Sequence, residues 1–366
     1  MRYFVTLVAV ALSVAIANAA PKPPPAKRPV VVDAREGDFL VRDFHCTSGE
    51  VFSELRQHYL TLGRPHRAAS GAIDNAVLIL HGTGGTGRQF LAPQFANVLY
   101  SAGGALDTTR FWVILPDGIG HGRSSKPRDG LHMRFPHYGY TDMVNAQYRL
   151  VTEGLGIAHL RLVMGTSMGG MHTWVWATMY PGMMDALMPL ACQPVAIAGR
   201  NRLWRDLIAD LITHDPAWQG GEYTQQPAGA MRAANAVLMI AGSAPTFMQH
   251  TMASRDTVDR YLASTLGARE KDFDANDLLY QLDSSRDYDP SAGLERITAP
   301  LTFVNSGDDF INPPELGIAE REIARVRTGT FVLIPASEKT HGHGSHTWAA
   351  LWETHLRALL ARSERR

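Results

Sequence analysis

Short apolar runs that alternate with helical patterns constrain this chain more than any other feature of its sequence. From residue 77 onward, apolar segments of a few residues recur, and several of them end at a glycine or a turn. Such runs are typical of buried strands in a parallel sheet, and the segments between them suit the covering helices. The predicted strands cover residues 77–80, 111–115, 160–164, 186–190, 301–304 and 330–334.

The spacing of these runs predicts an α/β fold with a mostly parallel central sheet flanked by helices. Residues 142–155 carry apolar side chains at helical spacing, and the segment before residue 77 is expected to add antiparallel edge strands. Residues 193–299 are too long for an ordinary crossover and must have structure of their own. We expect a helical lid there, over the sheet edge where ligands bind in open α/β folds, with the core over residues 31–192 and 300–366.

The first 30 residues differ from the rest of the chain. Arg2 precedes an apolar stretch over residues 3–16, and residues 17–19 (ANA) offer the small side chains of a signal-peptidase site. About 14 apolar residues are fewer than the roughly 20 that a membrane span needs. The pattern therefore predicts a signal peptide over residues 1–19 and a periplasmic or secreted protein, followed by a flexible, proline-rich leader over residues 20–30.

The composition gives no sign of several classes of partner. Lys plus Arg and Asp plus Glu both number 35, so no excess charge points to nucleic acid or to an anionic membrane surface. No later stretch is apolar for long enough to span a membrane, so we expect no span in the mature protein. Cys46 and Cys192 could pair in an oxidising compartment or remain buried thiols. The sequence does not set the oligomeric state.

The motif Gly165-Thr166-Ser167-Met168-Gly169 carries the strongest chemical signal. It reads G-x-S-x-G, follows a predicted strand and opens an apolar helix. This context is that of a nucleophile elbow, a tight turn that presents the serine hydroxyl at the positive end of a helix. We therefore predict that Ser167 is a nucleophile. The loop after the first parallel strand, which contains Thr83, is expected to complete an oxyanion hole from the backbone N–H groups of Thr83 and Met168.

The acid and the base of a catalytic triad are expected after the later strands. Asp309 follows the strand at 301–304 and lies four residues before Pro313, a spacing usual in this kind of fold, so we prefer it to Asp308. His343 follows the last strand between two glycines. In the predicted triad, His343 takes the proton of Ser167, while Asp309 fixes the tautomer of His343 and stabilises the imidazolium.

Two other motifs in the sequence could bind a dinucleotide or a zinc ion. Three glycines spell the G-x-G-x-x-G of a dinucleotide site, but the acidic residue expected at the end of the next strand is not well placed. Three histidines spell H-x-H-x-x-H, which can hold zinc, but zinc sites of that type usually carry Asp where Ser345 stands and lie early in a chain. We predict neither a cofactor nor a metal. The residues concerned are Gly82, Gly84, Gly87, His341, His343 and His346.

Residues 165–181 (GTSMGGMHTWVWATMYP) resemble the elbow and following helix of the homoserine O-acetyltransferase-like branch of the α/β hydrolases. Residues 142–147 and 215–223 are similar to the same branch, and the similarity spans about 320 residues, roughly 40–360. The resemblance implies an α/β-hydrolase fold, a helical lid, and acyl transfer through an acyl-serine on a small-molecule substrate. It also supports the roles of Ser167, Asp309 and His343.

The chain departs from this branch at positions that concern the acyl acceptor. Gly344 follows the predicted histidine, where the transferases usually carry Asp. Ala209 stands where they carry an Arg suited to a substrate carboxylate, and Arg205 lies one turn earlier. An exported enzyme would also lack acyl-coenzyme A. We therefore predict a serine hydrolase that cleaves an ester or related acyl bond, with an O-acyltransferase of the homoserine acetyltransferase type as the alternative and a non-catalytic binding module as a third hypothesis.

Overall fold

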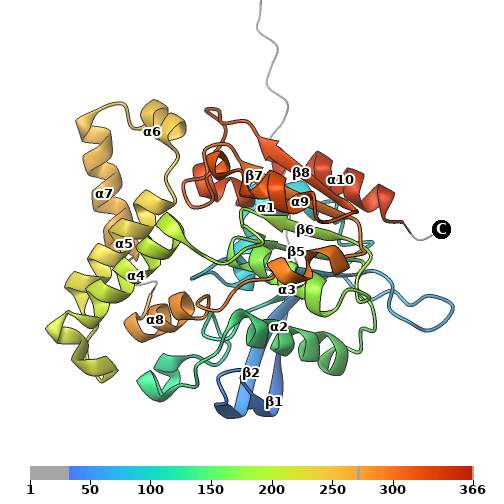
Figure 1. Ribbon diagram of the computed structural model, residues 1–366, viewed down its shortest axis with the longest axis horizontal. Coiled ribbons are helices and arrows are strands. Elements are labelled where there is room, and N and C mark those ends of the chain that lie inside the picture. Colours follow the sequence, from blue (N-terminus) through green and yellow to red (C-terminus); the bar gives the residue numbers. More distant parts are fainter. Residues whose placement is uncertain (1–32, 270–272, 365–366) are drawn as a thin grey trace, which may run out of the picture.

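A computed structural model describes residues 33–269 and 273–364, and the strands in these ranges form one eight-stranded sheet (Figure 1). The strand order is β1-β2-β4-β3-β5-β6-β7-β8. Strands β3 to β8 are parallel, whereas β2 pairs antiparallel with both β1 and β4, so the predicted mostly parallel sheet with antiparallel edge strands is confirmed. The strands are β1 (Arg35–His45), β2 (Val51–Leu62), β3 (Ala76–Leu80), β4 (Trp112–Pro116), β5 (Leu162–Thr166), β6 (Leu187–Leu190), β7 (Leu301–Ser306) and β8 (Gly329–Ile334).

Helices cover both faces of this sheet because its central strands are apolar on both sides. Every residue of β3 is buried; Leu78 and Leu80 point into one core layer, and Val77 and Ile79 into the other. The first layer is closed by α2, α3 and α9, and the second by α1 and α10. These helices are α1 (Pro93–Leu99), α2 (Tyr140–Arg149), α3 (Met168–Met179), α9 (Ile318–Ile323) and α10 (Glu353–Arg362).

The helix predicted at 142–155 begins two residues earlier and ends irregularly. The carboxylate of Asp142 accepts the backbone N–H of Gly139 at 2.8 Å, which satisfies a donor at the start of α2. After Arg149 the chain makes a π-helical turn over Leu150–Gly154. Gly156 then adopts a φ of +65°, a conformation that favours glycine and ends the helical run.

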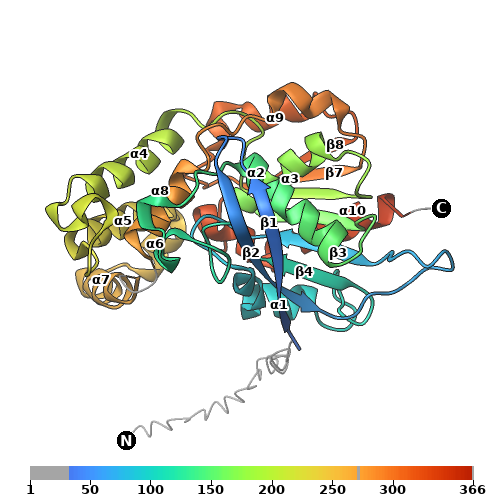
Figure 2. The same cartoon turned by 90° about the horizontal axis from the view of Figure 1, so that it is seen from below.

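Between β6 and β7 the chain forms a group of helices that we call the lid. It stands to one side of the sheet in both views (Figures 1 and 2). The lid has an apolar cluster of its own, which includes Trp204, Ile208 and Leu278, so it does not depend on the sheet for all of its burial. Its helices are α4 (Gly199–Thr213), α5 (Ala228–Ala241), α6 (Pro245–Thr251), α7 (Arg255–Arg269) and α8 (Ala275–Asp283).

The predicted signal peptide and leader lie outside the described residues. Within the described ranges, no helix combines the length and the apolar character needed to cross a membrane. Cys46 and Cys192 are both buried free thiols, so the structure corresponds to the unpaired alternative. Burial raises the pKa of the Cys46 thiol to about 12, which keeps it protonated at neutral pH.

Candidate active site

Three side chains from different loops meet at the carboxyl-terminal edge of the parallel strands. His343 Nε2 lies 2.8 Å from Ser167 Oγ, and His343 Nδ1 lies 3.0 Å from each carboxylate oxygen of Asp309. Ser167 follows β5, Asp309 follows β7 and His343 follows β8. The structure thus brings together the three residues that the sequence analysis selected, and Asp308 does not contact His343 through any hydrogen bond in the described residues.

Close backbone packing explains the two glycines around the serine. A Cβ atom on Gly165 would lie 2.1 Å from the carbonyl oxygen of Gly169, and one on Gly169 would lie 1.9 Å from that of Leu80. Ser167 itself has φ +56° and ψ −116°, a conformation that a non-glycine residue rarely adopts. Such strain of about 1–3 kcal/mol persists only where the surroundings impose it.

The loop after β3 lies directly against this turn. A Cβ atom on Gly82 would lie 3.3 Å from Ser167 Cβ, and Thr83 is the next residue along the loop. Met168 is the first residue of α3, and the first N–H groups of a helix have no intrahelical acceptor. The two predicted oxyanion donors, the N–H groups of Thr83 and Met168, therefore belong to segments that flank Ser167.

His81 holds the loop in place, a role that the sequence analysis did not assign. Its Nδ1–H donates to the carbonyl oxygen of Gly82 at 2.9 Å, and its Nε2 accepts the backbone N–H of Gly118 at 2.9 Å. This arrangement requires a neutral imidazole, and burial lowers the pKa of His81, which favours that form. The available signal was the position of His81 between a buried strand and a glycine loop.

The surroundings of the Asp309 carboxylate favour its ionised form beside His343. Its side chain is buried, and Oδ1 accepts the backbone N–H groups of Ile311 at 2.8 Å and Asn312 at 3.0 Å. Burial alone would raise the pKa of Asp309, but the charge of His343 and these hydrogen bonds outweigh burial and hold that pKa below its usual value. A buried carboxylate in this position stabilises a protonated His343.

A buried cation lies between the lid and the oxyanion loop. Arg205 of α4 is 2 % exposed, and its guanidinium contacts Asn201 Oδ1 at 3.1 Å and Ser285 Oγ at 3.3 Å. The Tyr140 hydroxyl is near the side chains of Arg205, Ser285 and Thr83 but makes no hydrogen bond among the described residues, so this cation lies near the loop beside Ser167. In the described part of the chain, no carboxylate lies within ion-pair distance of Arg205.

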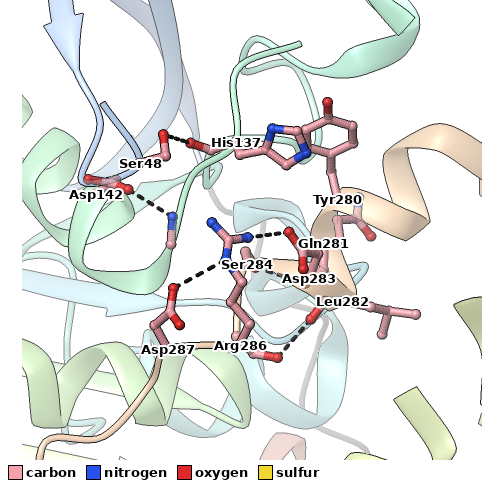
Figure 3. Close-up of polar contacts among 12 residues, drawn as sticks. Ser48, His137, Asp142, Tyr280, Gln281, Leu282, Asp283, Ser284, Arg286 and Asp287 are labelled. Carbon is pink, nitrogen blue, oxygen red and sulfur yellow. Dashed lines mark hydrogen bonds and ion pairs between the residues drawn. The ribbon is translucent and has the colours of Figure 1, made fainter. Parts of the chain in front are cut away.

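The segment that leads into α2 is braced from two sides (Figure 3). The carbonyl oxygen of His137 accepts the hydroxyl of Ser48, from the turn between β1 and β2, at 2.7 Å. The ring of His137 stacks on Tyr280 of α8, with 5.1 Å between ring centroids. Since Tyr140 lies only three residues further along, these contacts help to place it beside the oxyanion loop.

The three histidines of the H-x-H-x-x-H segment do not converge. The ring of His341 stacks on Trp348 with 3.9 Å between centroids, whereas the half-buried His346 has its ring nearly perpendicular to that of His343, with 5.2 Å between centroids. Over residues 33–269 and 273–364, no group of three or more His, Cys, Asp and Glu side chains could hold a metal ion. The geometry instead assigns His343 alone to Ser167.

A lid residue that the sequence analysis missed covers the glycine loop. A Cβ atom on Gly84 would lie 2.4 Å from the ring of Phe273, and Gly84 has a φ of +71°. Phe273 also packs against the apolar cluster of the lid. No periodicity in the sequence marks this residue, because its contact joins segments almost 190 positions apart.

Comparison with known proteins places this chain in a family. Residues 75–323, about two thirds of the chain, match the α/β-hydrolase-fold family. The chain belongs to this family. It is an enzyme of the α/β-hydrolase class and resembles the homoserine O-acetyltransferases, as the motifs around Ser167 had indicated.

Relatives with acyltransferase names match most of this α/β hydrolase. The homoserine O-acetyltransferase of Pelobacter propionicus is 31 % identical over 352 residues, which cover 84 % of this chain and 91 % of the relative. A probable acyltransferase of Methanothermobacter thermautotrophicus is 30 % identical over 282 residues, which cover 76 % and 84 %.

Solved structures confirm the fold. The acetyl esterase MekB has a TM-score of 0.79 and 22 % identity, with 89 % of this chain and 97 % of the esterase covered. The homoserine O-acetyltransferase of Bacillus anthracis has a TM-score of 0.77 and 20 % identity, with the same coverage. Esterases and acetyltransferases therefore share this architecture.

Proposed function

We propose that this α/β hydrolase is a serine hydrolase that cleaves an ester or related acyl bond of a small-molecule substrate. The contact of 2.8 Å between Ser167 Oγ and His343 Nε2, with Asp309 behind the imidazole, carries the proposal. A nucleophile in hydrogen-bond reach of a base that a buried carboxylate orients is the arrangement required for acyl-serine chemistry.

The reaction would proceed in two halves. His343 takes the proton of Ser167 as Oγ attacks the acyl carbonyl, and the negative oxygen of the tetrahedral intermediate faces the N–H groups of Thr83 and Met168. His343 then returns the proton to the leaving alcohol, which leaves an acyl-serine. A water molecule attacks the acyl carbon while His343 takes its proton, and the carboxylic acid departs as the proton returns to Ser167.

Two positions favour water as the acyl acceptor. Gly344 and Ala209 carry no charge where the homoserine acetyltransferases that the sequence resembles carry Asp and Arg. The second candidate is O-acyl transfer, which the names of the relatives favour. Arg205 and Ala209 line the same cavity of about 190 Å³ between the lid and the core, and the triad residues are not part of its lining.

We also propose that the protein is exported to the periplasm or beyond. The proposal rests on the sequence of residues 1–19, which carries the three parts of a signal peptide. Expression of the full-length chain in a bacterial host, followed by fractionation and N-terminal sequencing, tests it. A mature N-terminus at Ala20 in the periplasm is expected, and an uncleaved chain confined to the cytoplasm would contradict it.

A fluorophosphonate probe tests the acyl-serine chemistry. We expect labelling of the wild-type protein, loss of labelling in Ser167→Ala, a sharp decrease in His343→Ala, and no change in Ser70→Ala, which alters an exposed loop serine. Short-chain ester cleavage should follow the same order. A wild-type protein that is not labelled would refute the proposal.

A product-partition experiment determines whether the acyl group passes to water or to homoserine. With an activated acetyl ester as donor and homoserine in excess, hydrolysis releases acetate, whereas transfer yields O-acetylhomoserine. Acetate as the dominant product supports the main proposal. O-Acetylhomoserine as the dominant product would establish the second candidate instead.

A further inference from the structure

The loop that carries His343 is tied to the sheet edge by a carboxylate outside the triad. Asp308 Oδ2 accepts the backbone N–H of Gly342 at 3.2 Å, and it lies 2.8 Å from the hydroxyl of Thr340, which is equally close to the carbonyl oxygen of Ser337. Its other oxygen accepts the hydroxyl of Ser306, at the end of β7. Thr340 is fully buried and Asp308 is half-buried, so the contact between them lies partly inside the protein.

The two adjacent acids contact different parts of the loop that carries His343. Asp309 bonds to the ring of His343, whereas Asp308 bonds to the backbone directly before it. Hydrogen bonds to an ionised acceptor are about twice as strong as those between neutral groups. The ring of His343 and the backbone of the residue before it are thus both hydrogen-bonded to the same short segment after β7.

The lid also contacts the loop that carries His343. A Cβ atom on Gly342 would lie 2.3 Å from the carbonyl oxygen of Ser243, and Gly342 has a φ of +57°. The ring of Phe247 in α6 packs on His341 with 4.4 Å between centroids. The loop is therefore enclosed between the lid and Asp308, and the loss of the carboxylate would free it on the side of the sheet.

We propose that Asp308 is a positioning residue for the acyl-serine reaction, which sets the place of His343 relative to Ser167 through Thr340 and Gly342. The inference rests on the proposed function, because it assumes that His343 activates Ser167. A displacement of about 1 Å between reacting groups costs roughly 10²-fold in rate, so the anchoring of this loop bears directly on catalysis.

Asp107 provides a matched control. Its carboxylate accepts the N–H of Gly103 at 2.8 Å, and the N–H and hydroxyl of Thr109 at 2.9 and 2.7 Å. This loop precedes β4 and so lies at the amino-terminal edge of the parallel strands, opposite to Ser167. Asp107→Ala therefore removes a loop-anchoring carboxylate of the same kind without touching the site.

The test compares Asp308→Ala, Asp308→Asn and Asp107→Ala in the full-length protein. The measurements are the rate of fluorophosphonate labelling, kcat and KM for a short-chain ester, and the thermal midpoint. We expect Asp308→Ala to lower kcat and the labelling rate about 10²-fold with KM unchanged. Asp308→Asn should retain most of the rate, because the amide oxygen can accept the same two bonds. Asp107→Ala should lower the midpoint but not the rates.

Wild-type rates in Asp308→Ala, or an Asp308→Asn variant no better than Asp308→Ala, would overturn the inference while leaving the proposed function intact. If Asp308→Ala does not fold, Thr340→Val decides, because it removes the hydroxyl that contacts Asp308 and, with it, the acceptor of the Ser337 N–H; wild-type kcat in that variant would also overturn the inference. A wild-type protein that is not labelled would refute the proposed function, and the assignment of Asp308 with it.

Discussion

Replacement of Gly169 by alanine tests whether backbone packing beneath Ser167 controls its reactivity. A methyl group at this position would lie 1.9 Å from the carbonyl oxygen of Leu80 and 2.3 Å from its carbonyl carbon. These atoms belong to a buried central strand, so they cannot turn aside as a flexible side chain would. To restore ordinary contact, α3 would have to move away from β3 by about 1.5 Å.

This movement has consequences for both rate and stability. Ser167 immediately precedes α3 and would move with it, which would break its 2.8 Å contact with His343. Since a misplacement of about 1 Å costs roughly 10²-fold, we expect a decrease of at least that size in kcat and in the labelling rate. Overpacking of a tight core should cost about 1–3 kcal/mol in the free energy of unfolding.

The assay pairs fluorophosphonate labelling kinetics with urea unfolding. Gly182→Ala is the control, because a Cβ atom at Gly182 would meet no heavy atom of the described residues within 4 Å. It should leave both quantities unchanged. If Gly169→Ala labelled at the wild-type rate and unfolded at the wild-type urea concentration, the close approach to Leu80 would not be the constraint that we infer.

Three further changes have defined outcomes. Asp309→Asn should lower kcat by about 10⁴-fold at neutral pH, because His343 loses the partner that stabilises its protonated form; a loss below tenfold would contradict this role. Burial raises the pKa of Asp277 to about 7, so the folded state binds this proton more tightly than the unfolded chain does. The contribution of Asp277 to stability should therefore fall as pH rises from about 4 to 7, by up to about 1.4 kcal/mol per pH unit. In urea unfolding, the stability of the wild type relative to Asp277→Asn should fall over the same pH range. Asp142→Ala should cost about 1–3 kcal/mol in urea unfolding, because a fully buried carboxylate that accepts three hydrogen bonds is lost; unchanged stability would refute this.

Features that depend on neighbouring residues could be predicted from the sequence. The apolar runs predicted each parallel strand to within two residues at its start, because burial on both faces requires consecutive apolar side chains. The G-x-S-x-G motif predicted the turn at Ser167, because only glycine fits the close backbone contacts at Gly165 and Gly169. The end of α2 was less regular than predicted, because the chain makes a π-helical turn over Leu150–Gly154, where the hydrogen bonds run from i to i+5.

Features that depend on distant residues required the tertiary structure. The choice between Asp308 and Asp309 is an example, because adjacent residues point in different directions and only the loop that carries His343 decides which of them meets its ring. The contact of Phe273 with Gly84 joins the lid to the oxyanion loop. The sequence alone contained no signal for that contact.

The sequence by itself determined the α/β class, the order of the strands along the chain and the chemical identity of the residues that meet at the site, because these follow from local apolar spacing and from short motifs. The tertiary structure decided which acid serves His343, that Arg205 is buried with no carboxylate partner among the described residues, and that the lid contacts the histidine loop. The physical reason is that each of these depends on the crossing of segments far apart in the chain, whose relative placement is set by the packing of the whole sheet and lid.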